Sequence, residues 1–247
     1  MTRKPPFYAS GISSVSDPQP ESPPNSAPTT PCLPPTILAI ANQKGGVGKT
    51  TTAINLATAL AASGERVLLI DLDPQGNAST GLGISRTNRG AGTYALLLDD
   101  NASESIAVPS IIENLDVVAA DPDLAGAEIE LVSADGREYR LRNALRQKRA
   151  GSDYSFILID CPPSLGLLTL NGLVAANAVL VPLQCEFFAL EGITQLVRTI
   201  ERVKQALNPT LRLQGIVLTM YDRRNNLSDL VAADARGFFG SQVYDTM

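Results

Sequence analysis

From residue 36 onward, short apolar runs alternate with longer amphipathic segments. Six apolar runs have the length of buried strands, and they lie at residues 37–41, 66–71, 115–118, 155–160, 178–182 and 213–218. Other segments place apolar residues at helical spacing, and we expect helices at residues 49–63, 121–132, 138–149, 164–175, 189–206 and 228–239. Continuous apolar strands separated by helices are typical of a parallel sheet covered on both faces. The pattern therefore predicts an α/β fold with a doubly wound, mostly parallel sheet, and ligands at the carboxyl ends of its strands.

Residues 1–35 have a different composition from the rest. Ten of the 17 prolines lie there, among serine, threonine and asparagine. Such a segment cannot bury enough apolar area to offset the entropy lost on ordering. We expect a disordered tail over residues 1–35 and one folded domain over residues 36–247.

Composition narrows the possible chemistry. The chain has no histidine, which excludes imidazole catalysis and histidine metal ligands. Its three cysteines (Cys32, Cys161 and Cys185) are widely spaced, which indicates a reducing cytoplasm without a disulfide framework. We expect no membrane span and no secretory signal, because no apolar run is long enough and the N-terminus has no apolar core. The net charge is −5, so nucleic-acid binding would need a local basic patch.

A glycine-rich segment, Lys44-Gly45-Gly46-Val47-Gly48-Lys49-Thr50-Thr51, joins the first strand to the first helix. The strict P-loop pattern GxxxxGK[ST] fails, because Gln43 occupies the first glycine position. The physics is nevertheless the same, since glycines let backbone N–H groups wrap phosphate oxygens at a helix N-terminus. We expect Lys49 to bridge the β- and γ-phosphates of ATP and the Thr50 hydroxyl to reach Mg²⁺. The alternative is a turn that binds nothing, and the lysines and threonines in this context weigh against it.

Three aspartates follow the ends of predicted strands. Asp71 and Asp73 end the second run, and Asp160 ends the run that begins at residue 155. Mg²⁺ is usually held by few carboxylates together with waters and phosphates, so Asp71 and Asp160 are candidate metal residues. Asp73 begins a loop that could sense the γ-phosphate and hold the attacking water. The alternative is that all three are ordinary loop-capping aspartates.

The region from residue 198 to residue 236 is locally basic. Its seven basic residues and four acidic residues give a net charge of +3, and the basic ones are Arg198, Arg202, Lys204, Arg212, Arg223, Arg224 and Arg236. Lysine and arginine contacts to phosphates supply non-specific DNA affinity. On charge alone, a solvated helix face is the simpler interpretation.

Several motifs together resemble one family. The KGGxGKT form of the loop and residues 67–77, 160–166, 182–192 and 218–224 look like the ParA (Soj) branch of deviant Walker A, chromosome-partitioning ATPases, in order over residues 36–247. The resemblance implies a P-loop NTPase that partitions chromosomes or plasmids. It would bind non-specific DNA on the nucleoid as an ATP-sandwich homodimer, and a ParB-type partner would stimulate the hydrolysis that releases it.

The same resemblance implies roles for individual residues. Lys44 would contact the ATP of the partner subunit, and Lys49 with Thr50 would hold phosphate and Mg²⁺. Asp73 would hold the hydrolytic water, and Asp160 would hold the metal through a bound water. Arg223 matches a DNA-contacting arginine of the family.

The chain departs from the family pattern at its end. It stops at residues 242–247, where the family normally continues with an IPRNVRxxEAPS-like segment and a last helix. We therefore expect a fragment or a truncated product, with base recognition, DNA affinity and the covering of the last strand affected.

Four other interpretations stay open. A cargo-positioning relative would share these motifs. A membrane-bound division-site regulator like MinD would need a C-terminal amphipathic helix, and an inactive fragment would bind a partner or DNA without turnover. An iron–sulfur site on Cys161 and Cys185, as in nitrogenase reductase, is disfavoured because Cys161 directly follows the candidate metal aspartate; buried, inert thiols are the simpler expectation.

Overall fold

The computed structural model describes residues 1–2, 34–99, 106–147, 154–186 and 189–246. The chain divides into two units, residues 1–32 and residues 33–247. The tail expected over residues 1–35 lies almost wholly outside the described residues, so its disorder stays a prediction.

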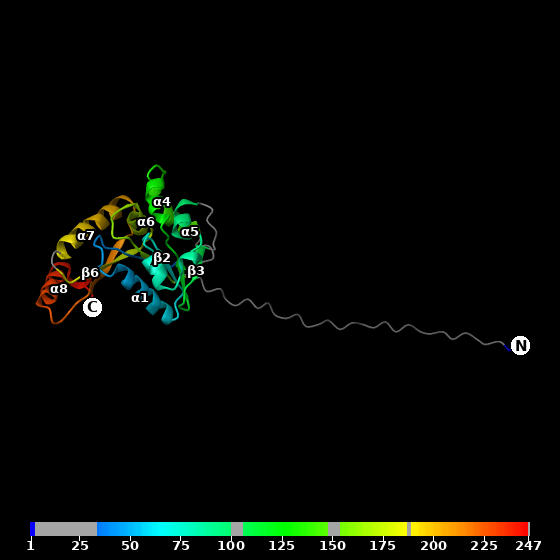
Figure 1. Ribbon diagram of the computed structural model, residues 1–247, viewed down its shortest axis with the longest axis horizontal. Coiled ribbons are helices and arrows are strands. Elements are labelled where there is room, and N and C mark those ends of the chain that lie inside the picture. The colour runs from blue at the N-terminus through cyan, green and yellow to red at the C-terminus, as the bar shows by residue number, and fades with distance from the viewer. Residues whose placement is uncertain (3–33, 100–105, 148–153, 187–188, 247) are drawn as a thin grey trace. The chain divides into compact units, whose positions relative to one another are not determined.

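One mostly parallel sheet forms the centre of the folded unit. Among the described residues it has seven strands in the order β3-β4-β2-β5-β1-β6-β7, and only β3 is antiparallel to its neighbour. The strands are β1 Thr36–Ile40, β2 Val67–Asp71, β3 Ala107–Pro109, β4 Leu115–Val118, β5 Phe156–Asp160, β6 Ala178–Gln184 and β7 Arg212–Thr219. Figure 1 shows α7 and α8 near one end of this sheet and β3 at the other. The predicted α/β class and mostly parallel sheet are confirmed.

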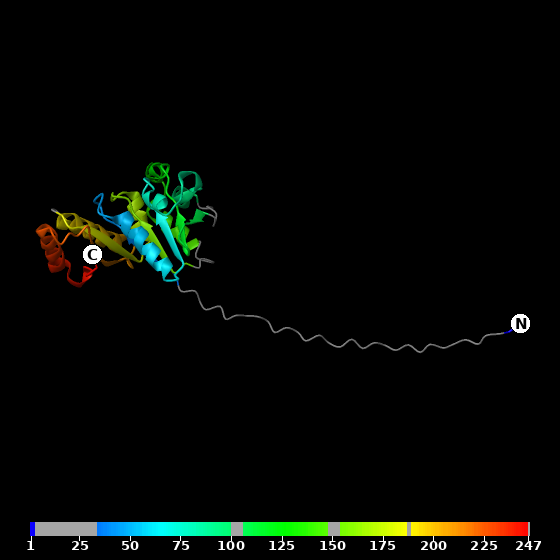
Figure 2. The ribbon, with the colours of Figure 1, turned by 60° about the horizontal axis from the view of Figure 1, so that its bottom comes forward.

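Helices cover both faces of the sheet. They are α1 Lys49–Ala62, α2 Asn77–Gly81, α3 Gly92–Leu98, α4 Leu124–Leu131, α5 Arg140–Gln147, α6 Leu167–Ala175, α7 Ala189–Ala206 and α8 Asn226–Phe239. Ile40 packs in the core layer that contains the alanines of α1, whereas Ala39 packs in the opposite layer. This alternation follows from the two-residue period of a strand, and it buries β1 on both faces. Figure 2 shows α1 lying across its face of the strands.

Among the described residues between β2 and β4, four short elements were not expected from the sequence: α2, the 3-10 helix Arg86–Asn88, α3 and β3. Two expected helices also begin three residues later than their pattern indicated. Before α4, the Asp121 carboxylate accepts hydrogen bonds from the N–H groups of Asp123 and Leu124, so these residues form a capping turn. Before α6, Gly166 is extended and ends the loop that contains two prolines.

Strand register gathers the candidate residues at one edge. Asp160 of β5 lies opposite Ile40 of β1 on one side and opposite Asp71 of β2 on the other. The segment that follows β1 is the glycine-rich loop. The glycine-rich loop, Asp71 and Asp160 therefore lie together at the carboxyl ends of three neighbouring parallel strands.

Among the described strands, β7 is the last in the sheet order and forms one edge of the sheet. Val243 forms an isolated parallel bridge with Ile216, and the Tyr244 N–H donates to the Ile216 carbonyl at 2.9 Å. These contacts pair only a short part of β7.

Candidate active site

The glycine-rich loop has the backbone that a phosphate cradle requires. Gly46 and Gly48 have φ of 76° and 87°, in the left-handed region that favours glycine. Gly48 is the N-cap of α1 and supplies no side-chain cap, so the first N–H groups of α1 stay available to an anion. The loop is fixed from β7, because the Thr219 hydroxyl donates to the carbonyl of buried Val47 at 2.8 Å. Gly45 has open space around it, which leaves the loop accessible.

Lys49 points into this loop. Its side chain is 6% exposed, and its Nζ donates to the Lys44 carbonyl at 2.8 Å. Burial lowers the pKa of this ammonium, and the charges of Asp160 and Asp73 oppose that effect. A buried cation held by one backbone carbonyl and attracted by the charges of two carboxylates is well placed to exchange that carbonyl for phosphate oxygens. Thr50 and Thr51 follow in the first turn of α1.

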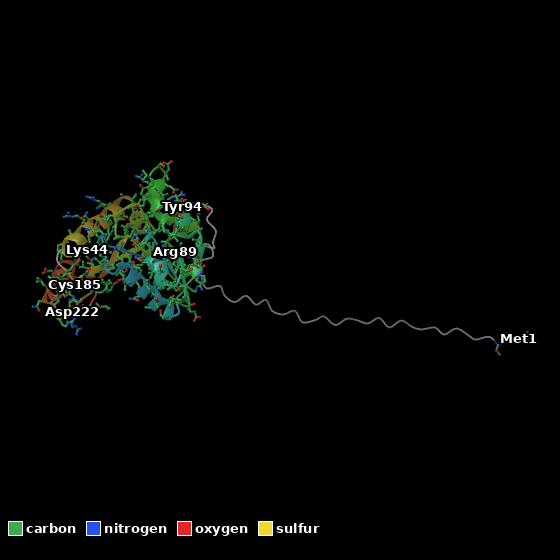
Figure 3. The ribbon with its side chains drawn as sticks, in the orientation of Figure 1. Met1, Lys44, Arg89, Tyr94, Cys185 and Asp222 are labelled. Carbon is green, nitrogen blue, oxygen red and sulfur yellow. The ribbon has the colours of Figure 1, made fainter. Side chains whose placement is uncertain are left out.

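The side chains of Lys44 and Gln43 contact residues near the start of α7 rather than the phosphate loop. Lys44 is exposed and forms an ion pair with Glu186 (Figure 3 labels Lys44). The Gln43 amide donates to the Gly192 carbonyl at 3.0 Å and to Gln195 Oε1 at 3.3 Å. Sequence reasoning treated Gln43 only as a departure from the P-loop pattern and missed this connection, which spans about 150 residues of chain and leaves no local signal.

Asp71 is fully buried and is occupied by its own chain. One of its oxygens accepts from the Ser79 N–H at 2.9 Å and hydroxyl at 2.7 Å, and the other accepts from the Asp73 N–H at 3.2 Å. Burial raises the pKa of Asp71, and these hydrogen bonds act in the opposite direction. Because both oxygens already have donors, this carboxylate holds the start of α2.

Asp160 is also fully buried, but its environment differs. Neither of its oxygens makes a hydrogen bond of normal geometry within the described residues, although the Thr50 hydroxyl lies beside it. Burial and then the charge of Asp71 raise the pKa of Asp160 to about 7, while Thr50 and Lys49 favour its charged form. A buried polar group without a partner needs an explanation, and a bound ion is one.

These residues fit a divalent cation held jointly with a nucleotide. No cluster of three or more acidic or thiol side chains that could hold a metal occurs in the described part of the chain. A cation beside Asp160 and Thr50 would therefore take its remaining ligands from phosphates and waters, as Mg²⁺ does in nucleotide sites.

Asp73 begins the turn after β2. Its Oδ1 accepts from the Gln75 N–H at 3.0 Å, and its carbonyl accepts from the Gly76 N–H at 2.8 Å. The negative charge of Asp73 raises the pKa of both Lys49 and Asp160, so the three groups interact electrostatically.

A further residue, Arg89, holds the far end of this turn and was missed, because a lone arginine among polar residues gives no sequence signal. Arg89 is 3% exposed, and its guanidinium donates to the Gly76 carbonyl at 3.1 Å.

Arg223 lies apart from this centre, on the exposed loop between β7 and α8. It makes no hydrogen bond or ion pair with the residues that the structure describes, whereas Arg224 pairs with Asp222 at 2.9 Å. Arg223 is therefore the side chain of this loop that is free to meet an external anion.

The thiols of Cys161 and Cys185 are buried and form no disulfide among the described residues, and the Cys161 thiol donates to the Ile159 carbonyl at 3.9 Å. Burial raises the pKa of both thiols. A thiol with a raised pKa is a poor nucleophile and metal ligand at neutral pH.

Comparison with known proteins identifies the family. A family model described as an AAA domain matches residues 35–213. The chromosome partitioning protein ParA of Caulobacter vibrioides is 64% identical over 211 residues, which are 85% of this chain and 79% of that protein. The chain belongs to the ParA/Soj family of partitioning ATPases. Soj of Bacillus subtilis, named a sporulation initiation inhibitor protein, is 50% identical over 85% of this ParA/Soj chain and 83% of its own length.

A solved structure shares the ParA/Soj fold seen here. The protein named cobyrinic acid a,c-diamide synthase from Mycobacterium smegmatis, with bound ATP analog and magnesium, has a TM-score of 0.77 and 45% identity, and 82% of each chain is covered. The sheet order and the helices on both faces place this ParA/Soj chain among P-loop NTPases. None of the helices described in this ParA/Soj chain is sufficiently long and apolar to span a membrane.

Proposed function

We propose that this chain hydrolyses ATP in a Mg²⁺-dependent reaction and uses the cycle to partition chromosomal or plasmid DNA. The observation that carries the proposal is the unpartnered, buried carboxylate of Asp160 beside Thr50 and Lys49, at the mouth of a loop shaped for phosphates. Family membership and the nucleotide and magnesium named for the Mycobacterium smegmatis structure support ATP and Mg²⁺ as its ligands.

Binding of ATP would use Lys44, Gly45, Gly46, Val47, Gly48, Lys49, Thr50 and Thr51. The N–H groups of the loop and of the first turn of α1 take the phosphate oxygens, and the Lys49 ammonium leaves the Lys44 carbonyl for the β- and γ-phosphates. The Thr50 hydroxyl and Asp160, directly or through a water, hold the metal. Asp71 acts on the loop rather than on the metal, because its oxygens already accept hydrogen bonds.

Hydrolysis would depend on Asp73. Its carboxylate accepts a hydrogen bond from the attacking water and orients it toward the γ-phosphorus, while Lys49 stabilises the charge that develops on the phosphate oxygens. Mg²⁺, when bound, supplies Lewis-acid stabilisation of the same oxygens. The products are ADP and inorganic phosphate.

Dimerisation would add the partner's Lys44 to the site. For that, Lys44 exchanges its ion pair with Glu186 for the phosphates of the facing subunit. The dimer would then present two copies of Arg223 to DNA phosphates, without base readout. A ParB-type partner would accelerate hydrolysis and release the DNA, so the nucleotide state controls DNA retention.

The test measures ATP turnover with and without Mg²⁺, DNA and a candidate activator. Oligomeric state is followed by light scattering, and Lys49→Ala is the inactive control. We expect Mg²⁺-dependent turnover that DNA and activator raise, and an Asp73→Ala protein that binds ATP and stays dimeric and DNA-bound. A folded wild-type chain that neither turns over nor dimerises with ATP would refute the proposal and favour an inactive binding protein. Adjacency of the gene to one for a ParB-type protein separates DNA from other cargo.

A further inference from the structure

Arg89 is a buried arginine outside the phosphate-binding loop. Figure 3 shows it in the body of the folded unit, and its side chain is 3% exposed. Its Nη1 donates to the Ala120 carbonyl at 2.5 Å, and its Nη2 donates to the Gly76 carbonyl at 3.1 Å and the Thr80 hydroxyl at 2.7 Å. No carboxylate pairs with it in the described part of the chain, and its Nε has no partner there. The guanidinium therefore ties three groups together with its charge uncompensated by an acid.

Burying an arginine without an acidic partner costs more free energy than packing an apolar side chain in the same place. A buried charge without an ion-pair partner is costly, and an apolar side chain of similar volume would pack at lower cost. What the guanidinium provides is geometry, because its fixed fork of N–H donors sets the separation and direction of the groups that accept from it. The segments so joined are the start of α2 and the residues that follow β4.

The turn that carries Asp73 ends at the site of this clamp. Gly76 has φ of 65°, and a Cβ at that position would overlap the Arg89 guanidinium and come within 3.1 Å of the Ala120 carbonyl oxygen. Its N–H donates to the Asp73 carbonyl at 2.8 Å, which closes the turn. Asp71 holds the other side of the same turn through the Asp73 N–H and Ser79. Asp73 is thus fixed from both sides, by a carboxylate before it and by a guanidinium after it.

We propose that Arg89 is a positioning residue for hydrolysis, which holds the turn of residues 73–76 so that the Asp73 carboxylate faces Lys49 and the phosphate site. This inference rests on the proposed ATPase function. Arg89 does not touch the nucleotide, so its loss disturbs the orientation of Asp73 much more than the binding of ATP. The consequence is a fall in kcat with little change in nucleotide affinity, because misplaced catalytic groups lose rate steeply.

The chain offers a matched control in Arg140. Its Nε and Nη2 also donate to two backbone carbonyls, those of Leu97 at 2.8 Å and Leu98 at 3.0 Å, but at the end of α3. Arg140 is half-buried rather than buried, and replacing it removes a backbone clamp without touching the turn of residues 73–76. A general loss of stability lowers activity in both variants, whereas a positioning effect lowers kcat in the Arg89 variant alone.

The experiment compares Arg89→Met, Arg89→Lys and Arg140→Met in the full chain. For Arg89→Met we expect kcat to fall at least tenfold, with the Kd of a fluorescent ATP analog within twofold of wild type. Arg89→Lys keeps a donor without the fork and is expected to recover part of kcat. Arg140→Met is expected to keep kcat within twofold. Hydrogen exchange at the Gly76 amide should be at least tenfold faster in Arg89→Met and unchanged in Arg140→Met.

Wild-type kcat in Arg89→Met, or equal losses in the Arg89 and Arg140 variants, would overturn the inference. If Arg89→Met does not fold, Arg89→Lys is judged by the same separation of kcat from Kd. If wild type shows no turnover, the proposed ATPase function fails by itself. Hydrogen exchange at the Gly76 amide then still tests whether Arg89 fixes the turn. Unchanged exchange in the Arg89 variants would show that it does not.

Discussion

The fit between Gly76 and the Arg89 guanidinium predicts a large difference between two glycine substitutions. Gly76 and Gly136 have nearly equal left-handed φ values, 65° and 62°, but a Cβ at Gly136 meets nothing within 4 Å. Gly136→Ala therefore measures only the loss of stability from placing alanine in the left-handed backbone conformation, about 1–2 kcal/mol. Gly76→Ala has the same backbone cost and in addition displaces the guanidinium.

The added cost follows from the hydrogen bonds of Arg89. A displaced guanidinium loses bonds to two carbonyls and one hydroxyl, and each hydrogen bond to a charged group contributes roughly 1.5–3 kcal/mol. Partial relaxation of the long side chain recovers some of this. We expect Gly76→Ala to lower the free energy of unfolding by about 3–5 kcal/mol in total.

Urea unfolding followed by circular dichroism measures both variants, and an unchanged m-value shows that a shifted midpoint reports stability. Combining Gly76→Ala with Arg89→Met should cost much less than the sum of the single losses, because both remove the same clamp. Equal losses in Gly76→Ala and Gly136→Ala would refute this account of the turn.

Three further outcomes are expected. Arg223→Ala should weaken DNA retention by the ATP-bound chain and lower the magnitude of the salt slope by about 1 per site in a filter-binding titration, whereas Arg224→Ala, which loses only an exposed ion pair, should change it little. The metal-free chain should become less stable as pH rises from 4 to 7. Asp160 has a pKa of about 7 in the folded state against an ordinary 3.8, so only the folded state keeps this proton between the two values. Asp160→Asn should therefore flatten this part of the pH profile of urea midpoints. Ser79→Ala should cost about 1–3 kcal/mol in thermal unfolding, since it leaves the buried Ala120 N–H without the acceptor it has at 3.1 Å.

The sheet and the phosphate site are predictable because their signals are local. An apolar run followed by glycines, a lysine and a threonine specifies a strand, a cradle and a helix within about 25 residues, and Asp160 follows its strand directly. Parallel packing then gathers these strand ends without further information. The six expected strands and helix α1 agree with the structure for this reason.

The elements between β2 and β4 depend on distant contacts and were missed. The short α2 is rich in residues of low helix propensity, and it is held by Asp71 and Arg89 rather than by its own sequence. The Thr93 hydroxyl near the start of α3 donates to the Asp71 carbonyl at 2.7 Å, a bond across 22 residues. Neither contact has a periodic pattern, so the role of Arg89 became visible only in three dimensions.

The link between Gln43 and α7 has a mechanical consequence. Gln43 stands where the strict P-loop has glycine, and its amide donates to Gly192 and Gln195 in the first two turns of α7. Later turns of the same helix carry Arg198 and Arg202. A movement of Gln43 would therefore either break these two hydrogen bonds or displace the start of α7. The departure from the strict pattern thus ties the loop to an 18-residue helix that carries Arg198 and Arg202 as exposed residues.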